Sequence, residues 1–177
     1  CGFYMIELVN GRGQIGTALK EILSKVNINT DVDVYIYHTW NIDNKTKEAQ
    51  QKEYKKFIEF VDNHKAKKIV FISTSSQKNN WYTYYKHFAE SYLLLTNENP
   101  VVIRLPTLIG KGIFSSFKHE NTAPYGTIEL MSIEEAASII IEKAVKSETI
   151  KNFHVNGEKV SAKYVRQLIL FGKDDER

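Results

Sequence analysis

The chain has 177 residues, which at about 100–200 residues per domain is enough for one domain and short for two. Hydrophobic residues make up 42% of the chain and charged residues 25%, and these ordinary shares exclude a disordered chain, a collagen-like repeat and a disulfide scaffold. The 24 basic and 21 acidic residues leave a net charge of +3, which is too small to indicate a nucleic-acid partner.

Targeting signals are sparse in this sequence. No apolar run approaches the roughly 18 residues that a membrane-spanning helix needs, so we expect no membrane partner. No secretory signal precedes the first apolar run, which favours a cytoplasmic protein. Cys1 is the only cysteine, so no internal disulfide can form. It is also where a lipid anchor would attach after signal cleavage, but an altered start with Met5 as the natural first residue fits better, because strand-like residues begin at once.

Two kinds of apolar pattern alternate along the chain: short β-rich runs, and longer stretches with apolar residues three and four apart. In chain order they predict strand 3–9, helix 14–26, strand 33–38, helix 45–64, strand 69–73, helix 81–96, strand 101–105, helix 132–146, strand 152–155 and helix 161–170. This alternation indicates βαβ units. The predicted fold class is therefore α/β, a Rossmann-like, doubly wound parallel sheet of about five strands with helices on both faces.

This pattern predicts a single domain over residues 1–171 and a charged tail over residues 172–177. The segment 111–127 has no clear period and is expected to be irregular. In doubly wound sheets, ligands bind beyond the carboxyl ends of the strands, at the point where the strand order reverses. Functional residues are therefore expected in the loops that follow the strands.

A glycine-rich turn joins the first predicted strand to the first helix. Gly11, Gly13 and Gly16 form the pattern G-x-G-x-x-G, in which glycine allows a tight turn, backbone approach to a pyrophosphate and close helix packing. The helix N-terminus adds unpaired N–H groups that suit phosphate. The sequence thus predicts a pyrophosphate site at Gly11, Arg12, Gly13, Gln14, Ile15 and Gly16; a tight turn without a ligand is the alternative. Arg12 either faces solvent or pairs with an adenosine 2′-phosphate, which would favour NADP.

The acidic residue that usually holds the adenosine ribose is missing. In dinucleotide folds it ends the second strand. Asp31 and Asp33 lie near the expected distance along the chain, but they precede the strand, which ends in His38-Thr39-Trp40. The adenosine part of a cofactor site therefore has no support in the sequence.

Hydroxyl groups and a lysine follow the third strand. Tyr82 and Lys86 are four residues apart, so one helical turn puts them on the same face. An ammonium near a phenol stabilises the phenolate and lowers its pKa from about 10, which would make Tyr82 a general acid or base. A hydroxyl from the serine-rich run 73–76 could hold a substrate oxygen beside it. The alternative is an ordinary exposed helical pair.

Several segments, taken in order, resemble the motifs of one family. They are the turn Gly13-Gln14-Ile15-Gly16, the strand 33–38, the serine strand 70–75, the Tyr82–Lys86–Glu90 spacing, the segment 104–110 and the late strand 153–157. Together they resemble the extended short-chain dehydrogenase/reductase superfamily, in its NAD(P)-dependent sugar-nucleotide epimerase, dehydratase and reductase branch. The resemblance covers nearly the whole chain, and several ordered motifs are far more specific than any one of them.

The resemblance implies an enzyme with a catalytic trio and a dinucleotide site. Ser75 would hold the substrate oxygen, Tyr82 would act as general acid or base, and Lys86 would tune it. Besides the glycine-rich turn, the cofactor, NADP or NAD, would contact His38, Thr39, Trp40, Lys86, Pro106 and Thr107. The implied substrate is a nucleotide-linked sugar, in surface polysaccharide biosynthesis. Homodimers that pair the long helices are common in that family.

The chain also departs from that family. It is much shorter than the family's members, and the stretch between the first helix and Asp33 is too short for the family's second and third strands, which carry much of the adenosine site. The substrate segment is reduced to 111–127. A non-catalytic Rossmann-like binding or scaffold protein that has lost the adenosine site is therefore the alternative function. The five histidines show no metal-ligand spacing, so no metal site is predicted.

Overall fold

A computed structural model describes residues 5–10, 13–25, 33–109, 126–146, 151–165 and 167. Several positions singled out in the sequence lie outside these ranges. They are Cys1, Gly11 and Arg12, almost all of the segment 111–127, the last residues of the predicted final helix and the tail 172–177.

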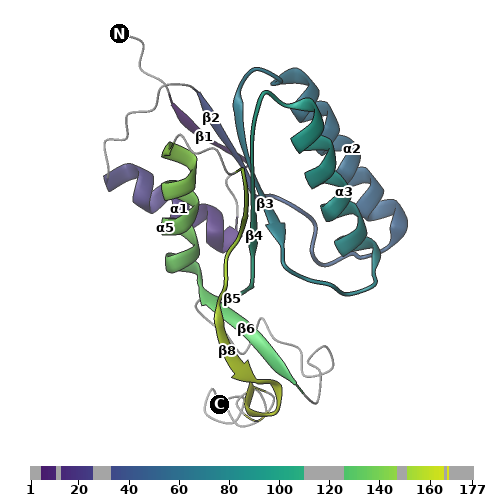
Figure 1. Ribbon diagram of the computed structural model, residues 1–177, viewed down its shortest axis with the longest axis vertical. Coiled ribbons are helices and arrows are strands. Elements are labelled where there is room, and N and C mark those ends of the chain that lie inside the picture. Colours follow the sequence, from purple (N-terminus) through teal and green to yellow (C-terminus); the bar gives the residue numbers. More distant parts are fainter. Residues whose placement is uncertain are drawn as a thin grey trace.

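The core of the molecule is a five-stranded sheet whose strands are all parallel (Figure 1). In order across the sheet the strands are β1 (Ile6–Val9), β2 (Val34–Tyr37), β3 (Lys68–Thr74), β4 (Asn99–Leu105) and β7 (Asn152–His154). Strand β3 is buried along nearly its whole length, as expected for a central strand covered on both faces. The predicted α/β fold class and strand number are confirmed.

Helices cover both faces of the sheet (Figure 1). On one face lie α1 (Gly13–Lys25) and α5 (Ile133–Val145), and on the other lie α2 (Lys47–Asn63) and α3 (Trp81–Thr96). Each face has its own apolar core, one containing Leu19 and Ile140, the other containing Phe57 and Leu93. The helices therefore form where the sequence places an apolar stripe opposite a strand.

The strand order simply follows the chain order from β1 at one edge to β7 at the other. The expected reversal of strand order is therefore absent from the described sheet, and no described strand lies beyond β1. As α1 and α2 lie on opposite faces while both connections step the same way across the sheet, these two crossovers have opposite hands. About 98% of such crossovers are right-handed, so one of the two breaks the rule.

A second, smaller sheet extends from the end of the first (Figure 1). It contains β5 (Thr107–Ile109), β6 (Thr127–Ser132) and β8 (Glu158–Ser161), in the order β5-β6-β8, with β6 and β8 antiparallel. The sequence pattern misses all three strands, because each is short and half exposed. The predicted helix from Ser161 is corrected at its start, since Ser161 ends β8 and helical residues begin at Ala162.

The small sheet needs one glycine for a close approach of backbones. A Cβ atom at Gly157 would lie 2.5 Å from the carbonyl oxygen of Leu130 in β6 and 3.0 Å from the Pro106 side chain. The turn between β7 and β8 therefore packs directly on β6 and on the β4–β5 junction. Within the described ranges, no helix is both long and apolar enough to cross a membrane.

Candidate active site

Helix α3 carries the residues of greatest chemical interest. Its first turn is capped by Asn80, whose side-chain oxygen accepts a hydrogen bond from the backbone N–H of Thr83 at 2.9 Å. Tyr82, Lys86 and Glu90 follow at intervals of four residues, so they lie on one face, which is the face packed on the carboxyl half of β3.

Lys86 is buried under aromatic rings. Its side chain is only 4% exposed, and Nζ donates a hydrogen bond to the backbone oxygen of Ile72 at 2.7 Å. The ring centroids of Phe71, Trp40 and Tyr82 lie 4.9, 5.1 and 5.8 Å from Nζ. Burial lowers the pKa of Lys86 to about 7, although two nearby carboxylates, Glu90 and Glu53, raise it. Lys86 is thus a lysine that changes charge near neutral pH.

Tyr82 differs from the sequence expectation in its electrostatics. Lys86 is close to its ring, as predicted, but burial raises the pKa of Tyr82 above its usual value, and the opposing effect comes from a side-chain hydrogen bond with Thr74. The expected lowering of the Tyr82 pKa by Lys86 is therefore wrong for the free protein, because burial, the largest effect on Tyr82, disfavours the phenolate. Tyr82 is a protonated phenol, ready to donate.

Ser75 lies at the carboxyl edge of the sheet, just after β3. Its backbone N–H and its hydroxyl both donate to the carbonyl oxygen of Leu105, at 3.1 and 3.2 Å. The loop after β3 is thereby fixed to the end of β4. The next serine, Ser76, accepts a hydrogen bond from the Thr83 hydroxyl at 3.2 Å, which fixes the same loop to α3.

The end of β2 brings three predicted cofactor-binding residues to the same edge. Thr39 donates to the carbonyl oxygen of Val9 at 3.0 Å, which ties the ends of β1 and β2 together. Nε2 of His38 is buried and has no hydrogen-bond partner among the described residues. Burial, and the positive charges of Lys20 and Lys86, lower the pKa of His38 to about 4, so its imidazole is neutral at pH 7.

Trp40 is held in place over Lys86 by a residue that the sequence pattern did not single out. The side chain of Trp40 is 8% exposed, and its Nε1 donates to Gln50 at 2.7 Å. Gln50 is fully buried in α2 and donates in turn to the carbonyl oxygens of Asn41 and Asn44. The available signal was a glutamine seven residues before Phe57, on the apolar stripe of a predicted helix.

The glycine-rich turn lies partly outside the described residues, because Gly11 and Arg12 belong to the undescribed positions. Gly13 begins α1 with a φ of 82°, in the region that favours glycine, and its carbonyl oxygen accepts from the Thr17 hydroxyl. Gly16 is buried, Ile15 is half-buried and packs on the core, and Gln14 is exposed. The first turn of α1 thus stands at the carboxyl edge of β1, where phosphate would meet a helix N-terminus.

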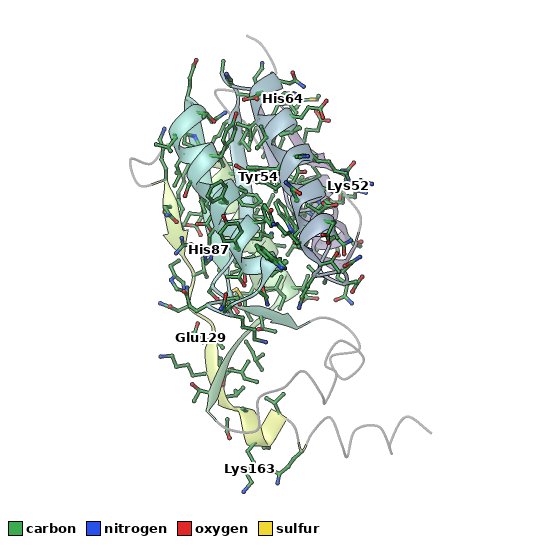
Figure 2. All side chains as sticks on the ribbon, turned by 90° about the vertical axis from the view of Figure 1, so that its right-hand side faces the viewer. Lys52, Tyr54, His64, His87, Glu129 and Lys163 are labelled. Carbon is green, nitrogen blue, oxygen red and sulfur yellow. The ribbon has the colours of Figure 1, made fainter. Side chains whose placement is uncertain are left out.

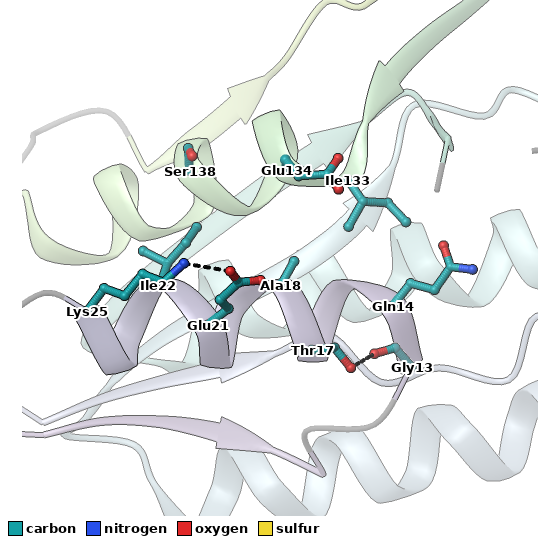
Figure 3. Close-up of a pocket in the computed structure, with 10 residues that line it drawn as sticks. All are labelled: Gly13, Gln14, Thr17, Ala18, Glu21, Ile22, Lys25, Ile133, Glu134 and Ser138. Carbon is teal, nitrogen blue, oxygen red and sulfur yellow. Dashed lines mark hydrogen bonds and ion pairs between the residues drawn. The ribbon is translucent and has the colours of Figure 1, made fainter. Parts of the chain in front are cut away.

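A hollow of about 550 Å³ lies between α1 and α5 (Figure 3). Gln14, Thr17, Glu134 and Ser138 are among the residues that line it, as are Glu21 and Lys25, which form an ion pair on α1. Ser75, Tyr82 and Lys86 are not among the residues that line this hollow. It belongs to the outer groove between the two helices, away from the Trp40-covered lysine.

The remaining predicted residues lie at the β4–β5 junction. Pro106 is buried between the two strands, and Thr107 is exposed at the start of β5.

Among the described residues, no group of three His, Cys, Asp or Glu side chains is placed to hold a metal ion.

These positions fit one end of a dinucleotide. The first turn of α1 offers backbone N–H groups, and Nε2 of His38, which has no partner in the described part of the chain, offers a buried polar atom at the same sheet edge. Lys86 and Tyr82 offer a cation and a proton donor, although Trp40 covers the cation. For the adenosine end, the described residues offer no strand beyond β1 and no strand-end carboxylate.

Comparisons with known proteins give structural neighbours only. No family model and no curated protein matches the sequence. A GDP-L-fucose synthetase from Naegleria fowleri has a TM-score of 0.68 at 12% identity, over 94% of this chain and 82% of that one. An L-threonine 3-dehydrogenase from Trypanosoma brucei has a TM-score of 0.67 at 12% identity, over 96% and 80% of the two chains. A UDP-glucose 4-epimerase from Thermotoga maritima has a TM-score of 0.66 at 13% identity, over 93% and 81%.

At these identities the likeness is one of fold. It confirms the Rossmann-like α/β fold that the sequence predicts. The structure of one further neighbour, an enzyme from Bordetella bronchiseptica, contains NAD and UDP, and another structure of the fucose synthetase contains NADP.

Proposed function

We propose that this chain is an NAD(P)-dependent enzyme that epimerises, dehydrates or reduces a nucleotide-linked sugar, in surface polysaccharide biosynthesis. The observation that carries the proposal is the row Tyr82, Lys86 and Glu90 on the inner face of α3, docked on the last residues of β3 with Ser75 next in the loop. The fold shared with enzymes of that class supports it. The segment 111–127 would serve as a reduced substrate segment of a single domain.

Tyr82, Ser75 and Lys86 would each have one role in the proposed reaction. Tyr82, kept protonated by burial, would give its proton to a carbonyl oxygen of the substrate, and Ser75 would hold that oxygen by a hydrogen bond. Lys86 would bind ribose hydroxyl groups once the Trp40 ring moves aside, and its ammonium would then stabilise the phenolate that Tyr82 leaves. A bound nicotinamide would supply the hydride.

The pyrophosphate end of this proposal can be tested at Gly13. A Cβ atom there meets no atom of the described residues within 4 Å, so Gly13→Ala adds backbone strain of about 1–2 kcal/mol but no clash with that part of the chain. The methyl group would stand beside the helix N-terminus that phosphate must approach. We expect at least a tenfold loss of NADPH affinity, measured by fluorescence titration.

Gly126 is the matched control for that variant. It has a φ of 94° and lies just before β6, and a methyl group added there would also meet no atom of the described residues within 4 Å. Gly126→Ala should lower the free energy of unfolding by a similar amount and leave NADPH affinity unchanged. If NADPH binds with equal affinity to the two alanine variants and the wild type, the pyrophosphate does not bind at this turn.

A homodimer is part of the proposal. Trp81, Tyr84, Phe88 and Leu95 form an exposed apolar row on α3, at intervals of three, four and seven residues, with Leu95 85% exposed. Figure 2 looks onto this side of the molecule, where Tyr54 of α2 joins the row and stacks edge-on against Phe88. An antiparallel pair of α3 helices centred on Phe88 would set Trp81 against Leu95 of a second copy, as twofold symmetry requires.

Charging the centre of this row tests the dimer. Phe88 is half exposed, so Phe88→Arg should leave the fold intact and place two like charges at the symmetry axis. We expect the mass measured by light scattering to fall from that of a dimer to that of a monomer. Tyr164→Arg, at an exposed aromatic residue outside α3, should leave the mass unchanged. A monomeric wild type would contradict the dimer.

One observation favours a second candidate function, a non-catalytic binding or scaffold protein. The Trp40 ring, clamped by Gln50, covers Lys86, and the described residues supply no adenosine site beyond β1. Such a protein would bind no dinucleotide at all. Titration of the wild-type protein with NADPH and NADH therefore separates the two functions.

A further inference from the structure

One buried carboxylate joins α3 to two strands of the sheet. Glu90 is 3% exposed and accepts a hydrogen bond from the Ser73 hydroxyl of β3. Arg104 of β4 donates to the same carboxylate, with Nη2 at 2.6 Å from Oε2 and Nε at 3.1 Å from both oxygens. Ser73 and Arg104 are direct neighbours in the register of β3 and β4. A single side chain is thus bonded to both strands.

The helix face that carries Glu90 contacts β3 at two further residues. Glu90 bonds Ser73, while Lys86, one turn earlier, bonds the oxygen of Ile72, and Tyr82, two turns earlier, bonds Thr74. Three successive residues of β3 therefore each meet one residue of a single helix face. Because all three contacts come from one helix face, a displacement of α3 relative to β3 would strain them together.

We infer that Glu90 is a positioning residue: through Ser73 and Arg104 it holds α3 in the register that presents Lys86 and Tyr82 to a ligand. The last step of this inference, ligand binding, rests on the proposed function. The register and the charge of Lys86 can be measured without any ligand.

Charge gives Glu90 a second effect on Lys86. The titratable groups that face Lys86 are Glu90 and Tyr82 on α3, Glu53 on α2 and His38 at the end of β2, while Arg104 on β4 is bonded to Glu90. His38 is neutral at pH 7, and Tyr82 is protonated. The two carboxylates are therefore the groups that keep the ammonium charged against the effect of burial.

The test compares Glu90→Gln with Glu53→Gln. Both variants remove a carboxylate that raises the pKa of Lys86, but Glu53 lies on α2 and pairs with Lys56 on its own helix. The midpoint of the Lys86 titration is followed by NMR on protein with ¹³C-labelled lysine. We expect it to fall by about one pH unit in Glu90→Gln and by less in Glu53→Gln.

The position of α3 relative to β3 is followed separately, by hydrogen exchange and by NADPH titration. Glu90→Gln and Ser73→Ala, which leaves the charge in place, should speed exchange of the α3 amides and leave those of α2 unchanged. Glu90→Gln should also weaken NADPH binding about tenfold at pH 7. If the unpaired Arg104 prevents this variant from folding, the double variant Glu90→Leu with Arg104→Leu removes both charges and takes its place.

The outcomes separate this inference from the proposed function. A folded Glu90→Gln protein with the wild-type Lys86 midpoint and wild-type exchange in α3 would overturn the positioning role, whatever the wild type binds. A wild-type protein that binds no dinucleotide would contradict the proposed function. It would also contradict the inference that Glu90 presents Lys86 and Tyr82 to a ligand. A lowered Lys86 midpoint and faster α3 exchange would still establish the hold of Glu90 on α3 and Lys86.

Discussion

Replacing Tyr82 with Phe is expected to lower turnover by about 10²–10⁴-fold and to leave NADPH affinity within about twofold. The variant keeps the ring that packs against Lys86 and removes only the hydroxyl. That hydroxyl is the proton donor of the proposed reaction, and burial keeps it protonated in the free protein. The measurement is turnover of NADPH with a panel of nucleotide-linked keto-sugars.

Two neighbouring tyrosines provide the controls. Tyr84 is exposed on the outer side of α3, and Tyr85 packs into the apolar core, so neither shares the face of Tyr82 and Lys86. Tyr84→Phe and Tyr85→Phe should keep turnover within about threefold of the wild type. Loss of activity in either of them, with an active Tyr82→Phe protein, would place the proton donor at another residue.

Replacing Lys86 with Met is expected to lower both turnover and NADPH affinity, turnover by about 10²-fold or more, because it removes the ribose contact and the charge that stabilises the phenolate. The same variant has a signature in stability that needs no ligand. The pKa of Lys86 is about 7 in the folded protein, against 10.5 for an ordinary lysine. Between these two values the unfolded chain binds more protons than the folded one.

The sign of the pH dependence follows from that difference. The contribution of Lys86 to the free energy of unfolding rises with pH between about 7 and 10.5, because over that window the unfolded chain holds a proton that the folded chain has lost, and raising the pH disfavours the state that holds it. Urea unfolding from pH 6 to pH 10 should show this rise in the wild type and a flatter curve in Lys86→Met. Lys47→Met, at an exposed lysine of α2, should keep the wild-type slope. Parallel curves for all three proteins would mean that Lys86 titrates normally.

The sequence pattern predicts the main sheet and its helices well, because each of these elements carries its own local signal. Ser132, for example, marks the start of α5, and its hydroxyl accepts from the backbone N–H of Glu135 as the capping pattern predicts. Likewise, the four-residue spacing of Tyr82 and Lys86 places both on the inner face of α3.

Features that depend on distant parts of the chain could not be predicted in this way. The position of β1 at the sheet edge depends on which strands pair, and no local pattern encodes that. The pKa of Tyr82 depends on burial and on Thr74, so the spacing to Lys86 gave the wrong direction. Trp40 covers Lys86 because its indole N–H is bonded to Gln50, which lies ten residues later in α2.

Binding of a dinucleotide by the wild-type protein is the most direct measurement of all, because the proposed roles of Gly13, Tyr82 and Lys86 all require it. Trp40 lies 5.1 Å from the Lys86 ammonium, so a nicotinamide ring at this site would quench its fluorescence. Titration with NADPH should show saturable quenching with one site per chain, reduced at least tenfold in affinity by Gly13→Ala. If neither NADPH nor NADH shows saturable binding at millimolar concentration, the proposed enzyme activity is contradicted and the non-catalytic function is favoured.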